Sequence, residues 1–203
     1  MEETQNHSKQ SRIFLAIGTS AQLQQKICDW QKNYNKRNPA DGAKLRLIAP
    51  QNLHLTLIPP WYATKEEISL LIHHLQNLTP TLPRPFTVVF NQITFGPKPN
   101  EPRLIWLSGE TPPALFDLKN KVEQCLANAP APGEPAAGEK RPFKLHLTVA
   151  RFRGEDFRHF KTQPLDKKIN WEEEISAFYL MESHLSPKGS DYAVIEKFGL
   201  PQK

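Results

Sequence analysis

Two short segments of the chain share one alternation of polar and apolar residues. They are residues 54–57, His-Leu-Thr-Leu, and residues 146–149, His-Leu-Thr-Val. A period of two is typical of a half-buried strand, so the histidine and threonine share one face while the apolar residues face a core. We therefore expect two strands that each present an imidazole and a hydroxyl, about 6.5 to 7 Å apart at about 3.3 Å per residue.

The sequences that precede the two segments also match. The apolar segment 13–17 begins 41 residues before His54, and the apolar segment 104–107 begins 42 residues before His146. Between each apolar strand and its motif, the apolar spacing predicts one amphipathic helix. Repetition of one unit predicts two similar strand–helix–strand lobes, related by a pseudo-twofold arrangement that brings the two His-x-Thr strands face to face across a cleft.

The remaining pattern predicts further helices and strands. The helix of the first lobe begins after Thr19 or Ser20, and its buried side carries Leu23, Ile27, Trp30 and Tyr34. Further helices begin at the capping box 64–67 and at 111–113. Additional strands are predicted over 45–48, 86–95, 103–108, 175–181 and 192–198. The expected fold is α+β, with two mostly antiparallel sheets lining a central cleft and helices on the outside.

Two segments carry less regular patterns. Residues 152–172 show no clear periodicity, and the acidic triplet 172–174 is interpreted as the solvated start of a strand. Residues 129–142 are rich in Pro, Gly and Ala, which predicts a flexible loop that serves either as a lid or as a connector. We expect a flexible leader over 1–11 and a single bilobal domain over 12–203.

Composition narrows the class of protein. With 203 residues, of which 38% are hydrophobic and 23% charged, the chain is long enough for a core of its own. The net charge of +5 comes from dispersed Lys and Arg, so it favours an anionic partner only mildly. Cys28 and Cys125 have no metal-site spacing, and no window approaches 18 apolar residues. We expect a cytoplasmic monomer with no membrane partner.

Paired histidines suit the hydrolysis of a cyclic phosphodiester. One imidazole can take a proton from water while the other protonates the departing sugar oxygen, because histidine titrates near neutral pH. The neighbouring threonine hydroxyls can donate to the non-bridging oxygens as charge develops. A lone histidine in a strand is more often a structural residue, but the matched repetition favours a site.

These motifs, with the segments 12–17, 50–57 and 141–151, resemble the two-histidine phosphoesterase superfamily, and within it the bacterial and archaeal RNA 2',3'-cyclic phosphodiesterases, also called 2'-5' RNA ligases. The resemblance implies a water-filled cleft and hydrolysis of RNA 2',3'-cyclic phosphate ends to 2'-phosphates without a metal or other cofactor. It also implies weak reversible 2'-5' ligation.

The resemblance further implies roles for individual residues. His54 and His146 would be the acid and the base, in an order that the sequence does not fix, although we favour His54 as the acid. Thr56 and Thr148 would bind the phosphate, and Arg151 would be an additional phosphate contact. The offset of five from His146 places Arg151 on the opposite face of a regular strand, so this role requires a twist, a bulge or a strand end.

Two aromatic residues are further candidates for substrate binding. Phe14 lies in the opening strand, and Trp61 follows the first motif in the segment Ile-Pro-Pro-Trp, where many relatives continue Phe-Leu-Gly. Trp61 or Tyr62 would replace a displaced aromatic that stacks on a base, whereas the alternative for Trp61 is a core or rim position.

The expected partners are RNA 3' ends or small cyclic nucleotides. Two other functions remain open at this point. One is 2'-5' RNA ligase or 2'-5' phosphodiesterase activity, and the other is a non-catalytic RNA-binding module that uses a basic cleft.

Overall fold

The computed structural model describes residues 10–39, 44–98, 100–128, 143–159, 165, 167–186 and 189–202. The expected flexible loop 129–142 and most of the expected leader lie outside these residues. The first strand begins at Ser11, one residue before the expected start of the domain.

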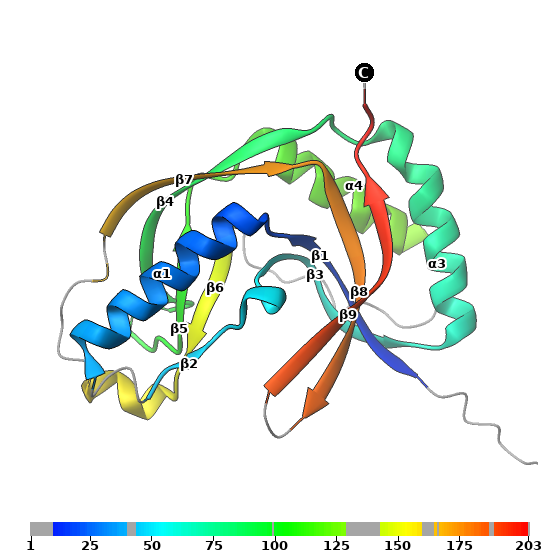
Figure 1. Ribbon diagram of the computed structural model, residues 1–203. Coiled ribbons are helices and arrows are strands. Elements are labelled where there is room, and N and C mark those ends of the chain that lie inside the picture. Colours follow the sequence, from blue (N-terminus) through cyan, green and yellow to red (C-terminus); the bar gives the residue numbers. More distant parts are fainter. Residues whose placement is uncertain are drawn as a thin grey trace, which may run out of the picture.

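The strands form two antiparallel sheets, which confirms the expected α+β class (Figure 1). In order across the four-stranded sheet, the strands are β3 (His54–Ala63), β1 (Ser11–Gly18), β8 (Ala177–Ser186) and β9 (Gly189–Gly199). In order across the five-stranded sheet, they are β2 (Arg46–Leu47), β6 (His146–Arg151), β5 (Leu104–Ser108), β4 (Phe86–Gly96) and β7 (Lys167–Ile175). Each His-x-Thr segment therefore begins a strand of a different sheet.

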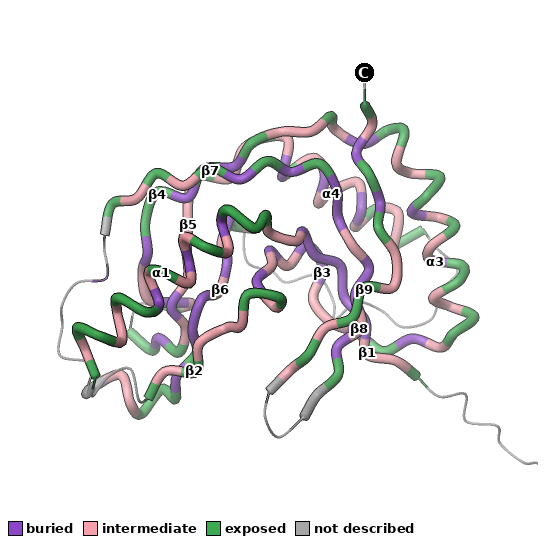
Figure 2. The backbone as a smooth tube through the Cα atoms, in the orientation of Figure 1, coloured by how far each residue is buried: buried purple, intermediate pink, exposed green. Residues whose placement is uncertain are grey.

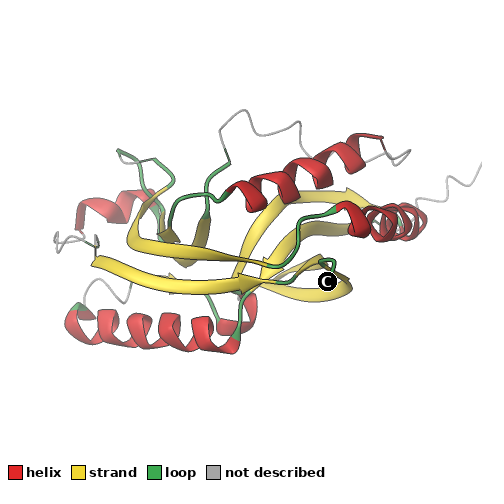
Figure 3. Ribbon diagram, turned by 90° about the horizontal axis from the view of Figure 1, so that it is seen from above, coloured by secondary structure: helices red, strands yellow, loops and turns green. Residues whose placement is uncertain are grey.

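Three helices flank the sheets in the described part of the chain: α1 (Ala21–Arg37), α3 (Lys65–Leu78) and α4 (Pro113–Asn128). Seen from above, α1 lies on one side of the strands and α4 on the other (Figure 3). The expected start signals are present, because Ser20 caps α1 and Thr64 forms a capping box with Glu67 on α3. None of these helices is long and apolar enough to span a membrane.

The predicted strand–helix–strand units are β1–α1–β3 and β5–α4–β6. Each helix contacts the sheet of the other unit, since α1 packs against β7 and α4 packs against β3. Buried positions follow the central strands of both sheets, whereas the outer faces of α1 and α3 are exposed (Figure 2). The two units therefore share one continuous hydrophobic core.

The acidic triplet 172–174 lies near the end of β7 and is not a solvated strand start, which corrects the expectation from the sequence. Ile169, Trp171, Glu173 and Ile175 alternate along the inward face of β7, and Glu173 is only 4% exposed. Its carboxylate accepts hydrogen bonds from the backbone N–H of Ser20 at 2.5 Å and from the Ser20 hydroxyl at 2.7 Å. The alternation of apolar residues in β7 is interrupted by Glu173, so the sequence did not show the period of a strand. The charge of Glu173 lies at the positive end of the α1 dipole.

Gln31 occupies a position on α1 that the apolar pattern did not mark. The buried stripe is Leu23, Ile27 and Gln31, at intervals of four. The Gln31 amide donates to the carbonyl oxygens of Ile48 and Val149, at 3.0 Å in each case. Gln31 therefore links Ile48, which follows β2, to Val149 in the second motif on β6.

Candidate active site

Strand β3 holds the first motif with an irregularity directly after the threonine. His54 lies opposite Gly18 and Thr56 lies opposite Ala16 on β1. The register then shifts by one residue, so Leu57 has no counterpart on the neighbouring strand. The extra residue is a β-bulge, which reverses the face on which the following side chains lie.

Strand β6 repeats this geometry at the second motif. His146 lies opposite Ser108 and Thr148 opposite Trp106 on β5, and Val149 has no counterpart. The pattern of burial along the two motifs is also the same, with two consecutive buried residues after the threonine. The internal similarity of the sequence therefore extends to the position of the bulge.

The bulge in β6 determines the face of the strand on which the Arg151 side chain lies. A regular strand would place a side chain five residues after His146 on the opposite face, but the extra residue brings Arg151 back to the face of His146 and Thr148. All three residues line one cavity. The bulge that a phosphate contact by Arg151 requires is therefore present in β6.

The two imidazoles are held in the same way. His54 Nδ1 lies 2.7 Å from the carbonyl oxygen of Asn52, and His146 Nδ1 lies 2.8 Å from the carbonyl oxygen of Lys144. A carbonyl oxygen can only accept, so each Nδ1 carries the hydrogen. Each Nε2 is therefore the nitrogen that can accept a proton when the ring is neutral and donate one when it is charged.

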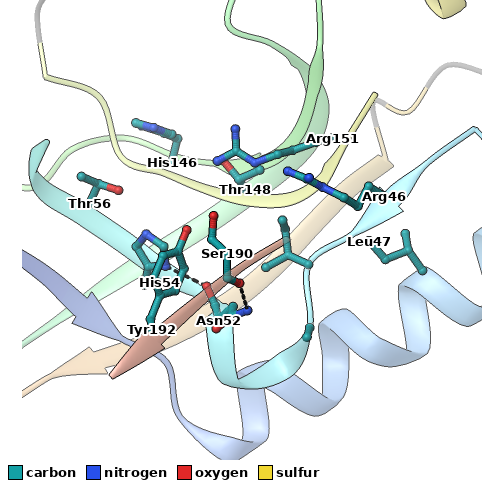
Figure 4. Close-up of a pocket in the computed structure, with 12 residues that line it drawn as sticks. Arg46, Leu47, Asn52, His54, Thr56, His146, Thr148, Arg151, Ser190 and Tyr192 are labelled. Carbon is teal, nitrogen blue, oxygen red and sulfur yellow. Dashed lines mark hydrogen bonds between the residues drawn. The ribbon is translucent and has the colours of Figure 1, made fainter. Parts of the chain in front are cut away.

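A cavity of about 160 Å³ lies between the sheets and collects five of the seven predicted site residues (Figure 4). These five are His54, Thr56, His146, Thr148 and Arg151. In the part of the chain that the structure describes, no group of three His, Cys, Asp or Glu residues gathers with the geometry of a metal site.

His54 is packed more closely than the sequence suggested. Its ring lies 5.2 Å from the ring of Phe14 and 5.1 Å from that of Tyr192, measured between centroids. Burial lowers the pKa of His54, and the positive charges of Arg151 and His146 add to this effect. The hydrogen bond to the Asn52 carbonyl acts in the opposite direction. In the free protein this environment favours the neutral imidazole.

The two aromatic candidates do not reach the cavity. Phe14 is 1% exposed and packs behind His54, so it supports the imidazole. Trp61 lies opposite Ile13 on β1 and belongs to the hydrophobic core at 7% exposure. This placement contradicts a base-stacking role for Trp61 and agrees with the alternative of a core position.

Several residues that line the cavity were not predicted from the sequence as site residues. Arg46 comes from β2, Asn52 from the turn before β3, and Ser190 and Tyr192 from β9. The Asn52 amide donates to the Ser190 carbonyl at 2.9 Å, which ties β9 to the segment that holds His54 (Figure 4). The alternate spacing of Ser190 and Tyr192 could have indicated a shared face, but only the fold brings β9 to the first motif.

Arg151 is surrounded by other basic residues. Burial lowers its pKa, and the charges of Arg46 and Arg103 act in the same direction. Tyr192 acts in the opposite direction. A cavity wall with the two guanidinium groups of Arg46 and Arg151 is suited to an anion, since arginine binds phosphate with two parallel hydrogen bonds.

The chain is similar to known proteins over most of its length. The sequence model of the 2'-5' RNA ligase superfamily matches residues 20–187, a span that includes both motif strands. The chain belongs to this superfamily. It is 30% identical to an RNA 2',3'-cyclic phosphodiesterase of Thermus thermophilus over 198 residues, covering 93% of this chain and 90% of the relative. It is 25% identical to an RNA 2',3'-cyclic phosphodiesterase of Archaeoglobus fulgidus over 191 residues, covering 92% of this chain and 99% of the relative.

Proteins with solved structures share the fold. The apo form of Escherichia coli LigT is 25% identical and superimposes with a TM-score of 0.71, covering 96% of this chain and 100% of LigT. LigT in complex with 3'-AMP superimposes with a TM-score of 0.72 at 23% identity, again covering 96% of this chain and 100% of LigT.

Proposed function

We propose that this protein is a phosphoesterase that hydrolyses 2',3'-cyclic phosphates at RNA 3' ends, or on nucleosides, to 2'-phosphates. The observation that carries the proposal is the matched pose of two imidazoles. Each ring donates from Nδ1 to a carbonyl two residues upstream, on strands with the same bulge, beside one cavity. The relatives named RNA 2',3'-cyclic phosphodiesterase support the same activity.

The reaction needs one neutral and one charged histidine. The neutral ring accepts a proton from water at Nε2, and the resulting hydroxide attacks phosphorus. The bond from phosphorus to O3' breaks, and O3' takes a proton from Nε2 of the charged ring, which leaves the 2'-phosphate. Each proton transfer contributes about 10² to 10⁴ in rate. The base ends protonated and the acid ends neutral, so exchange with water restores both.

Thr56, Thr148 and Arg151 stabilise the negative charge that develops on the non-bridging oxygens of the phosphate. Both hydroxyls lie on the cavity face of their strands, and Arg151 reaches the same face through the bulge. Donors that are already oriented need no rearrangement when the negative charge grows. In the order we favour, His54 is the acid and gains its proton together with the anionic substrate, whose charge opposes the effects of Arg151 and His146 on the pKa of His54.

The test is turnover of cytidine 2',3'-cyclic phosphate by purified protein in the presence of a chelator, with the 2'- and 3'-phosphate products separated by chromatography. We expect the 2'-phosphate, and a fall of about 10² to 10⁴ in kcat for His54→Ala and for His146→Ala. His73→Ala is the matched control, because His73 is an exposed histidine of α3. Absence of product from the wild-type protein, or full activity in either motif variant, would overturn the proposal.

A second substrate assigns the two roles. Bis(4-nitrophenyl) phosphate has a leaving group that departs without a proton, so the variant that lacks the acid retains a larger fraction of its activity on this ester than on the cyclic phosphate. We expect His54→Ala to show this recovery and His146→Ala to lack it. Recovery in His146→Ala alone would reverse the order.

A further inference from the structure

Two arginines face each other beside the reaction centre without an acidic partner. In the pairing of β2 with β6, Arg46 lies directly opposite Arg151, and both side chains line the cavity (Figure 4). Like charges directly opposite each other in an antiparallel pair are destabilising. Within the residues that the structure describes, no carboxylate forms an ion pair with either arginine.

The fold holds this arrangement firmly. The backbone N–H of Ile48 donates to the carbonyl of the bulge residue Val149 at 3.0 Å, and the buried Gln31 amide donates to both carbonyl oxygens of this pair. Lys44, two residues before Arg46, lies 3.9 Å from Asp156, so a nearby carboxylate is directed to a different cation. The backbone positions of Arg46 and Arg151 are thus fixed opposite each other at the cavity wall, and the carboxylate of Asp156 pairs with Lys44.

Arg46 lies beyond the reacting phosphate that Thr56 and Thr148 bind in the proposed function. Arg151 follows Thr148 by three residues, at most about 10 Å along the strand, and Arg46 lies one strand further, at a spacing of about 4.8 Å. Residues 46–49 line the same cavity as Asn52 and His54. A ligand whose reacting phosphate lies between the histidines would place a neighbouring anionic group near Arg46.

We propose that Arg46, with Arg151, forms a second phosphate site that binds the phosphodiester on the 5' side of the terminal nucleotide. The substrate class is then an RNA end with at least two phosphates, and a nucleoside cyclic phosphate is a poorer substrate. This inference rests on the proposed function, because the cyclic phosphate at the histidines fixes the position of the second phosphate. Arginine suits such a site, since its planar group binds two oxygens of one phosphate.

The experiment compares kcat/KM at fixed ionic strength for two substrates, adenosine 2',3'-cyclic phosphate and the dinucleotide ApA that ends in a 2',3'-cyclic phosphate. We expect the wild-type protein to prefer the dinucleotide by about tenfold to a hundredfold, the range for one hydrogen bond to a charged group. Arg46→Gln should bring this ratio towards one. Arg84→Gln is the control, because it makes the same change of charge at an exposed arginine that does not line the cavity.

Several results would overturn the inference. They are a wild-type ratio near one, an Arg46→Gln variant that loses the same factor on both substrates, and an Arg84→Gln variant that lowers the ratio as much as Arg46→Gln does. Equal loss on both substrates would mean that Arg46 contacts the reacting phosphate. Adenosine 5'-phosphate 2',3'-cyclic phosphate is the third substrate tested. A preference for it without a preference for the dinucleotide would show that the substrate is a small nucleotide and not an RNA end.

Binding separates this inference from the proposed function. Calorimetric titration compares adenosine 2'-phosphate with the dinucleotide ApA that ends in a 2'-phosphate. We expect tighter binding of the dinucleotide to the wild-type protein and loss of this difference in Arg46→Gln. If no cyclic substrate is turned over but the binding difference depends on Arg46, the hydrolase proposal fails and the second site stands. If turnover is present and neither ratio depends on Arg46, the second site fails and the hydrolase stands.

Discussion

Glu173 links the two sheets at a point close to the first motif. It belongs to β7 of the five-stranded sheet, and its carboxylate holds both the backbone N–H and the hydroxyl of Ser20, the residue that caps α1. The adjacent Thr19 hydroxyl donates to the Leu53 carbonyl at 3.1 Å, directly before His54. Removing the Glu173 carboxylate therefore releases the start of α1 from the opposite sheet.

The contacts set the size of the expected effect. A hydrogen bond to a charged group contributes about 1.5 to 3 kcal/mol, and two bonds to one carboxylate are not additive. We expect Glu173→Ala to lower the free energy of unfolding by about 2 to 4 kcal/mol. In a protein of this size the melting temperature changes by about 2 to 4 °C per kcal/mol, so it should fall by roughly 5 to 15 °C. Glu173→Gln keeps an acceptor but loses the charge at the helix terminus, and its effect should be intermediate.

Urea denaturation followed by circular dichroism measures this loss, with an unchanged m-value as the sign that only stability has altered. Glu172→Ala and Glu174→Ala are matched controls, because both neighbours are exposed on the same strand. Surface substitutions of this kind stay within about 0.5 kcal/mol of the wild type. A loss for Glu173→Ala no greater than that of the controls would refute the assignment of Glu173 as the link between the sheets.

Three further predictions concern stability and the support of the site. Because burial lowers the pKa of His54 below its ordinary 6.5, the unfolded chain binds this proton more readily. The free energy of unfolding should therefore rise with pH up to about 6.5, and an equal rise in His54→Gln would contradict this. Gln31→Met removes the donor to Ile48, and the unpaired carbonyl should cost about 1 to 3 kcal/mol in urea denaturation, with the exposed Gln25→Met as control. Gly96→Ala would force a methyl group into the indole of Trp106, and its thermal unfolding should show a loss of about 1 to 3 kcal/mol that Gly154→Ala, where space is open, lacks.

The sequence predicted the elements whose signal is local. Alternation revealed both motif strands, and the capping residues placed the starts of α1 and α3. Strand β7 escaped because one position of its inward face holds Glu173, whose partner Ser20 lies 153 residues away. Its burial depends on a tertiary contact, which composition within a short window does not reveal.

The same distinction explains the site. His54 and His146 were found because their motif repeats, whereas Arg46 and Tyr192 reach the cavity only through sheet pairing. The bulges leave a weak trace in the sequence, as two consecutive apolar residues after each threonine. Trp61 shows the opposite case, since an aromatic residue beside a motif suggested stacking while the strand directs it into the core.

The equivalent bulges also show where the twofold likeness ends. Five residues after the motif histidine, the second strand carries Arg151 and the first carries Pro59. Arg46 and Arg151 both line the cavity from the five-stranded sheet, so a ligand that enters meets two chemically different walls. The two ester oxygens of one phosphate bound there are then not equivalent, and the replacement of Pro59 by Arg151 at the matching position contributes to this difference.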